Sequence, residues 1–194
     1  MKLPLAILAA AACAACSQEP ASPAQEPTAA STSATPTASA PASPTPPASP
    51  SPDTLALEGL GALRIGEPVP AGSTWAERGA QASDTCRTVS SPDYPGVYAI
   101  VEGGRVRRIS AGQRSTVELA EGIGVGSSEA DVRAWFGGFR EEPHEYVAAP
   151  ARYLTAPNAA SGDPALRFEI GADGKVTQVH VGTMPALGNV EGCS

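Results

Sequence analysis

The chain has 194 residues and a formal net charge of −7, and 42% of its residues are hydrophobic. From Thr54 onward, 17 acidic residues outnumber 12 basic ones. This excess excludes a general affinity for nucleic acid, which requires a basic surface.

The first sixteen residues have the order of parts of an export signal peptide. Lys2 supplies a positive charge, a short apolar run follows, and small residues precede a cysteine, in Ala14-Ala15-Cys16. The apolar run is shorter than the roughly 20 residues that a membrane-spanning helix needs. We therefore expect residues 1–16 to be a cleaved signal peptide.

The cysteine at the end of this leader resembles that of bacterial lipoproteins, in which cleavage before cysteine leaves an N-terminal residue that carries lipid such as palmitate. Cys16 is the favoured site, and Cys13, with a leader short for that family, is the alternative. Neither cysteine precedes Asp, and in Gram-negative lipoproteins this favours the outer membrane. The resemblance therefore implies an envelope protein, lipid-anchored at the outer membrane and facing the periplasm; the alternative is a soluble secreted protein.

Residues 17–53 have the composition of a disordered tether. They hold ten of the 20 prolines, and the rest is mostly Ala, Ser and Thr, with no aliphatic side chain larger than Ala. Such a segment buries too little apolar surface to offset the entropy of ordering. We expect it to hold a domain of residues 54–194 clear of a membrane.

Cys86 and Cys193 are the remaining cysteines once the leader is set aside. In an oxidising compartment, two such cysteines most simply pair as a disulfide. A reactive thiol pair or a metal site is the alternative, although neither a Cys-x-x-Cys pattern nor a nearby His cluster supports one.

Alternating apolar residues and glycine-rich turns predict a series of short strands in the domain. In the first half of the domain, a short helical turn is predicted near residues 73–77, and Pro68 and Pro70 forbid helix before it. The expected strands lie at residues 55–57, 63–65, 97–101, 105–109, 115–119, 166–170 and 176–181.

One helix is clearly predicted. Ser128 fits an N-cap with Asp131 three residues later, a variant of the capping box. Val132, Trp135 and Phe136 form one apolar face, and glycines follow. The sequence thus predicts an α+β fold, mainly antiparallel sheet with one or two short helices.

The two halves of the domain, 54–120 and 121–194, look alike. Gly66 corresponds to Gly126 at an offset of 60, and Val106 corresponds to Val176 at an offset of 70. The extra ten residues match the size of the 156–164 loop. The halves are interpreted as two tandem repeats of a helix-plus-hairpin unit, with coincidence among glycine-rich hairpins as the alternative.

Residues 123–137, an apolar-x-apolar-Gly-Ser motif before a capped helix, resemble the repeat of beta-lactamase-inhibitor-type proteins and of small outer-membrane-assembly lipoproteins. Residues 63–75 resemble a degenerate copy. The end of the chain also resembles the tails of uncharacterised bacterial lipoproteins. The inhibitor and assembly families are non-enzymatic and act through protein contacts, and the resemblance implies the same here.

Few residues suggest chemistry. His180 lies between Val179 and Val181 and is expected on a solvated strand face. His144, in an acidic stretch, is expected in a polar loop; a metal role lacks a second histidine at helical spacing. No nucleophile motif or phosphate-binding loop is complete, so no catalytic residue, metal site or cofactor is predicted.

Four residues form the candidate contact surface. Arg105, Arg107 and Arg108 are the one basic cluster of an acidic domain, and Tyr94 lies in a turn. The favoured function is a lipid-anchored, non-enzymatic binding or protein-interaction module, whose partner is an envelope protein or a glycan. The alternative is a small periplasmic hydrolase or a lipoprotein that binds a metal or small ligand.

Overall fold

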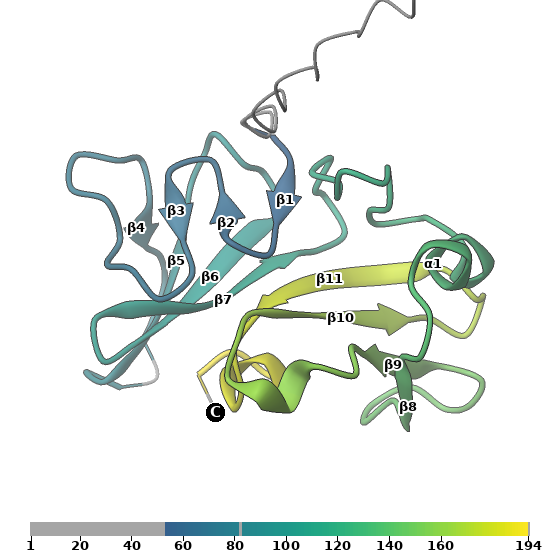
Figure 1. Cartoon of the computed structure of the whole chain (residues 1–194). Helices are drawn as coiled ribbons and strands as arrows, with labels where there is room; N and C mark the ends of the chain where they lie inside the picture. The colour runs from purple at the N-terminus through teal and green to yellow at the C-terminus, as the bar shows by residue number, and fades with distance from the viewer. Residues whose placement is uncertain (1–52, 82, 194) are drawn as a thin grey trace, which may run out of the picture. The chain divides into compact units, whose positions relative to one another are not determined.

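The computed structural model describes residues 53–81 and 83–193 (Figure 1). The predicted leader, with Cys13 and Cys16, and residues 17–52 of the predicted tether lie outside the described residues. Within the described part the elements are β1 (Leu55–Ala56), β2 (Gly59–Leu60), β3 (Leu63–Arg64), β4 (Ala76–Glu77), β5 (Cys86–Ser90), β6 (Val97–Glu102), β7 (Arg105–Ala111), α1 (Glu129–Trp135), β8 (Arg140–Pro143), β9 (Arg152–Thr155), the 3-10 helix η1 (Ala159–Ser161), β10 (Ala165–Ile170), β11 (Val176–Gly182) and the 3-10 helix η2 (Ala186–Gly188).

Eight strands form one antiparallel sheet in the order β4-β5-β6-β7-β11-β10-β9-β8. Two four-stranded meanders, β4 to β7 and β8 to β11, join along their last strands, where Val181 pairs with Ile109. In Figure 1 the long hairpins β6–β7 and β10–β11 lie beside each other at the centre of this sheet. The terminal strand next to β9 is β8, a four-residue strand.

One face of the large sheet carries the apolar core. Strand alternation places every second side chain of the central strands on this face. The core residues of these strands are Val97, Ala99, Val101, Val106, Ile109, Ala111, Leu154, Phe168, Ile170, Val176, Val179 and Val181. All of them are at most 3% exposed, so the aliphatic core expected from the composition is well shielded from water.

Helix α1 packs on this core through Val132 and Phe136, but Trp135, predicted on the same apolar face, is 63% exposed. The Ser128 hydroxyl accepts a hydrogen bond from the Asp131 amide, and the Asp131 carboxylate accepts one from the Ser128 amide. Val132 is fully buried, and the ring of Phe136 lies 5.7 Å from that of Phe168. The predicted capping box is therefore confirmed.

A separate three-stranded sheet, β1-β2-β3, closes one end of the core with Leu55, Leu60 and Leu63. Gly59 permits this tight meander. Its φ is +143°, and a Cβ atom there would lie 2.0 Å from the Leu63 carbonyl oxygen.

The α+β prediction is wrong, because the regular structure of the described chain is mostly antiparallel sheet, with one seven-residue α-helix. The predicted helical turn near Ser73 is absent: the Ser73 hydroxyl donates to the Pro70 carbonyl, and the chain extends into β4. The prolines that precede it hold the backbone in turn and extended conformations. Residues 115–119 contribute two isolated bridges, from Glu118 to Thr54 and to Gly124, in place of the expected strand.

The two halves share hydrogen bonds at the offsets found in the sequence. The Gly66 amide donates to the Val106 carbonyl at 2.8 Å, and the Gly126 amide donates to the Val176 carbonyl at 2.8 Å. In return, the Val106 and Val176 amides donate to residues 67 and 127. The hairpins β6–β7 and β10–β11 each carry one bulge as well. The two halves thus share these backbone contacts, but α1 has no counterpart helix in the first half of the described chain.

Candidate functional site

The opposite face of the large sheet carries polar side chains, and we call it the polar face. Its members follow from strand alternation on β6, β7, β9, β10 and β11. They are Tyr98, Arg108, Ser110, Tyr153, Thr155, Arg167, Glu169, Gln178 and His180. Most are buried, which is uncommon for charged residues unless each is paired.

The C-terminal segment, residues 183–193, covers part of this face. Its 3-10 helix η2 packs against β7, β10 and β11, with Ala186 and Leu187 fully buried. In Figure 1 the chain end lies beneath the central hairpins, next to η2. The covered strands therefore have buried residues on both of their faces.

His180 is the centre of a buried hydrogen-bond chain. Its Nδ1 lies 2.8 Å from the Ser110 hydroxyl, and its Nε2 lies 3.1 Å from a Glu169 carboxylate oxygen. Burial lowers the pKa of His180, with the charges of Arg108 and Arg167 acting in the same direction, so we assign a neutral ring at pH 7. In that state Nε2–H donates to Glu169, and Nδ1 accepts from Ser110.

Glu169 joins both histidines of the chain. Its second oxygen lies 3.5 Å from His144 Nε2 and accepts a 3.2 Å hydrogen bond from Gln178. Burial alone would raise the pKa of Glu169, but the hydrogen bonds that His180 and Gln178 donate to its carboxylate outweigh it, so the net direction is down. Glu169 is therefore the anion around which the polar face is arranged.

His144 connects this network to the loop between β8 and β9. Its ring stacks on Tyr153 with centroids 4.6 Å apart, and its Nδ1 accepts hydrogen bonds from the amides of Tyr146 and Val147. The Arg167 guanidinium lies 4.2 Å from the centroid of the Tyr153 ring, a cation–π contact. The buried carboxylate and the exposed loop thus share one chain of contacts.

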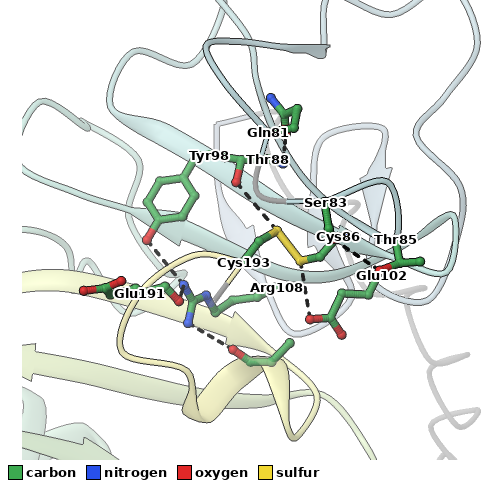
Figure 2. Close-up of a disulfide and its surroundings, with 11 residues drawn as sticks. Gln81, Ser83, Thr85, Cys86, Thr88, Tyr98, Glu102, Arg108, Glu191 and Cys193 are labelled. Carbon is green, nitrogen blue, oxygen red and sulfur yellow. Dashed lines mark hydrogen bonds between the residues drawn. A yellow bond between two sulfur atoms is a disulfide. The ribbon is translucent and has the colours of Figure 1, made fainter.

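Arg108 is fully buried under the C-terminal segment. Its Nη1 donates to the carbonyls of Ala186 and Asn189, at 3.0 and 2.5 Å, and its Nη2 lies 3.4 Å from both the Glu191 carbonyl and the Tyr98 hydroxyl. Figure 2 shows this guanidinium between Tyr98 and the chain end. Burial lowers the pKa of Arg108, partly offset by Tyr98.

A disulfide between Cys86 and Cys193 fixes the end of this segment, as Figure 2 also shows. It confirms the predicted pairing, and it joins residues 107 apart in the sequence. The chain-entropy model gives a loop of this length roughly 4–5 kcal/mol of stabilisation.

The buried chain Ser110–His180–Glu169 has the hydroxyl–imidazole–carboxylate order of a hydrolase triad. Its burial argues for a structural role, because Ser110 is 0% exposed and His180 is 2% exposed. A nucleophile must reach a substrate carbonyl, and this one contacts only its own sheet and cover. Among residues 53–81 and 83–193, no group of three or more His, Cys, Asp or Glu side chains has metal-binding geometry.

An open pocket lies on the β8–β9 hairpin, residues 140–155. It has a volume of about 390 Å³. Its lining is mainly apolar, and the apolar members are Pro143, Val147, Ala148, Ala149, Pro150 and Ala151. Tyr146 and Val147, at the tip of the hairpin, are 66% and 42% exposed.

An ion-pair network fixes this hairpin against α1. Arg133 donates to Glu129 at 2.7 Å and to Glu141 at 2.5 Å, and Arg152 donates to Glu141 at 3.0 Å. These guanidiniums hold the pKa of Glu141 below its usual range. Exposed pairs of this kind contribute little stability, but several together position the hairpin.

The structure separates the residues of the predicted contact surface. Tyr94 is half-buried and stacks on Trp75 with ring centroids 5.6 Å apart, and Arg105 is exposed and donates to the Gly66 carbonyl. Arg108, in contrast, is fully buried, so the expectation of three surface arginines is wrong. Arg107 occupies a bulge without a partner on β6, and this extra residue turns Arg108 onto the polar face.

The expectation for His180 is also wrong. Alternation correctly placed its side chain opposite Val179 and Val181, but the face it occupies is itself covered. The sequence reasoning missed Ser110, Arg167 and Glu169 as parts of a network. In the sequence, each of these residues is a polar side chain between two apolar neighbours. The strands that carry them and His180 come together only when the two hairpins pair in the folded sheet.

Comparison with protein-family models, with curated proteins and with solved structures gives no match. In the described residues, no helix is long and apolar enough to cross a membrane.

Proposed function

We propose that this chain is a lipid-anchored, non-enzymatic envelope protein whose folded domain binds a partner protein through the β8–β9 hairpin. The anchor rests on the sequence, in which a lipoprotein-like signal ends at Cys16 or Cys13 and a proline-rich tether follows. The resemblance to outer-membrane lipoproteins favours the periplasmic side of that membrane.

The observation that carries the binding role is the surface of the hairpin. Two of the four large hydrophobic side chains exposed in the described chain, Tyr146 and Val147, lie at its tip. Exposed apolar groups beside an apolar pocket are typical of interaction sites. Ser110, His180 and Glu169, in contrast, are buried, which supports a structural role for them.

The geometry favours an extended polypeptide as the partner. The terminal strand β8 lies next to the pocket, and an added strand forms backbone hydrogen bonds with such an edge while a side chain enters a neighbouring pocket. Glu141 and Glu142 line the pocket but are already paired with Arg133, Arg152 and Arg140, so backbone pairing and apolar contact would carry the recognition. The ion pairs with α1 keep the hairpin in place for such docking.

A hydrolase is the second candidate, because Ser110, His180 and Glu169 have the order of a catalytic triad. A fluorophosphonate probe distinguishes the two, since it labels activated serines. The binding proposal predicts no labelling of Ser110 in the full chain. Labelling that disappears in Ser110→Ala would favour the hydrolase.

Crosslinking in intact cells tests the proposal. The wild-type lipoprotein should copurify from crosslinked envelopes with a defined partner, and Tyr146→Ser/Val147→Ser should lose it. Leu57→Ser, which removes a different exposed apolar side chain, is the matched control and should retain the partner. Equal recovery of the partner with all three proteins would contradict the hairpin as the contact surface.

The lipid anchor is tested separately, by palmitate labelling of the Cys16→Ala and Cys13→Ala variants.

A further inference from the structure

We propose that Arg108 and Tyr98 form a binding site for an oxyanion, a carboxylate or phosphate group, that the end of the chain caps and the Cys86–Cys193 disulfide locks. Reduction of the disulfide by a dithiol opens the site. This inference does not depend on the proposed partner binding, although Tyr146 of the hairpin also contacts the cap through Glu191.

The first observation is the unusual state of Arg108. Its side chain is fully buried, and among the described residues no carboxylate lies within 4.0 Å of its guanidinium nitrogens. Its Nε is buried without any hydrogen-bond partner. A buried charge normally requires an opposite charge or complete hydrogen bonding, because desolvation is costly. Arg108 therefore has one donor, Nε–H, without an acceptor, and its charge has no counter-ion among the described residues.

The second observation concerns the groups that accept hydrogen bonds from the guanidinium in this structure. Beyond Ala186, its acceptors are the carbonyls of Asn189 and Glu191, which belong to the last six residues of the chain. These neutral oxygens occupy the positions at which the two oxygens of an anion would accept a bidentate pair of hydrogen bonds. Charge-assisted hydrogen bonds are roughly twice as strong as neutral ones, so an oxyanion is the better acceptor once the positions are vacant.

Tyr98 adds a further donor at the same place. Its hydroxyl accepts from Arg108 Nη2 at 3.4 Å and lies 3.5 Å from the Gln178 side-chain oxygen. Both interactions are long, so the hydroxyl hydrogen can turn to an incoming anion without losing a strong bond. Two guanidinium nitrogens and one phenol then converge on a single ligand.

The cap can open without disturbing the core. Leu187 and Ala186 are fully buried and hold η2 in place, but residues 188–193 are half-buried or exposed. Beyond η2, the segment is held by the disulfide, by the two carbonyl contacts with Arg108 and by the hydrogen bond from Tyr146 to the Glu191 carboxylate. Loss of the covalent link therefore leaves residues 189–193 held by a few polar contacts.

Opening is a balanced thiol–disulfide exchange. One thiolate of a dithiol attacks a sulfur of the Cys86–Cys193 bond and forms a mixed disulfide, and the second thiol displaces the protein sulfur. Two electrons and two protons pass to the protein, which gains two thiols, while the dithiol becomes a cyclic disulfide. Cys193 then leaves with the cap, and the oxyanion replaces the carbonyls of Asn189 and Glu191.

Calorimetric titration of the full chain in neutral detergent tests the proposal, with inorganic phosphate and acetate as separate probes at constant ionic strength. Dithiothreitol is the reductant, because it is uncharged and does not compete. We expect at least tenfold tighter binding of one or both anions to the reduced protein, and the same binding by Cys86→Ser/Cys193→Ser without reductant. Equal affinity in both redox states, or no binding to the reduced protein, would overturn the proposal.

Three variants assign the site. In the reduced state, Arg108→Lys keeps the charge but loses the planar fork, and Tyr98→Phe loses only the phenol; both should weaken binding severalfold. Arg114→Gln removes an exposed charge elsewhere and should bind as the wild type does. If Tyr98→Phe and Arg108→Lys are folded and bind as tightly as the wild type, the anion lies elsewhere and the assignment fails.

Hydrogen exchange of the wild-type protein tests the opening of the cap without any substitution. On reduction, the amide of Asn189, which donates to the Ala186 carbonyl, should exchange at least tenfold faster, while the amide of Leu187, which donates to the Thr183 carbonyl, keeps its protection. Unchanged exchange at the chain end would show that the cap stays closed, and would also overturn the proposal.

Discussion

Replacing His180 with Gln should flatten the dependence of stability on pH between pH 7 and pH 5. The histidine is 2% exposed, and burial lowers its pKa in the folded protein. In the unfolded chain it titrates near its ordinary pKa of about 6.5. Below that pH, His180 binds a proton in the unfolded chain but stays neutral in the folded protein, so acid favours unfolding.

The size of the effect follows from this difference of one proton. Stability is fully present above the unfolded pKa and falls by at most about 1.4 kcal/mol per pH unit below it. From pH 6.5 to pH 5 the His180 contribution is therefore at most about 2 kcal/mol. Glu169 acts in the same direction at lower pH, because its folded pKa is lowered and its stabilisation is lost only below the ordinary carboxylate range.

Urea unfolding of the disulfide-intact protein, followed by the fluorescence of Trp75 and Trp135, measures this dependence. The glutamine side chain can still donate a hydrogen bond to Glu169 but binds no proton, so the variant isolates the titration. The wild type should lose stability more steeply than His180→Gln between pH 7 and pH 5. Equal slopes would refute the assignment of a buried, neutral His180.

Three further substitutions test the fold. Ser128→Ala removes the N-cap of α1 and should lower the free energy of unfolding by about 1 kcal/mol in urea titrations; no change would refute the capping role. Leu154→Ala, in the centre of the core, should cost about 2–5 kcal/mol, and a cost below about 1 kcal/mol would contradict its full burial. Gly182→Ala places a Cβ atom 2.3 Å from the Arg107 carbonyl oxygen, so its melting temperature should fall; an unchanged value would contradict the close approach of β11 to β7.

Local signals in the sequence were sufficient for the hairpins and the helix. Short alternating strands around Gly103-Gly104 and Asp173-Gly174 depend on nearby residues alone, and so does the capping box at Ser128. The disulfide followed from having two cysteines outside the leader. The second helical turn failed because the Ser73 amide and hydroxyl donate to the Pro70 carbonyl and Ala76–Glu77 pair with β5, a long-range pairing that the local sequence does not record.

The candidate site could not be predicted because it depends on pairing between distant strands. Ser110 and His180 are neighbours only because the two meanders join along β7 and β11, and no local pattern records that join. The burial of Arg108 depends on a bulge at Arg107 and on a chain end that folds back over the sheet. The alternation of polar and apolar residues correctly predicted which face of the sheet His180 occupies. It could not predict that other segments of the chain cover that face.

Site-specific photocrosslinking in living cells tests the central claim, that the domain binds a partner through the hairpin of residues 140–155. A photoreactive amino acid at Val147 should give one defined adduct with an envelope protein, and the same group at the exposed residue Asp84 should not. Tyr146→Ser should reduce the yield at Val147 severalfold. Identical adducts from both positions, or none from Val147, would contradict the account.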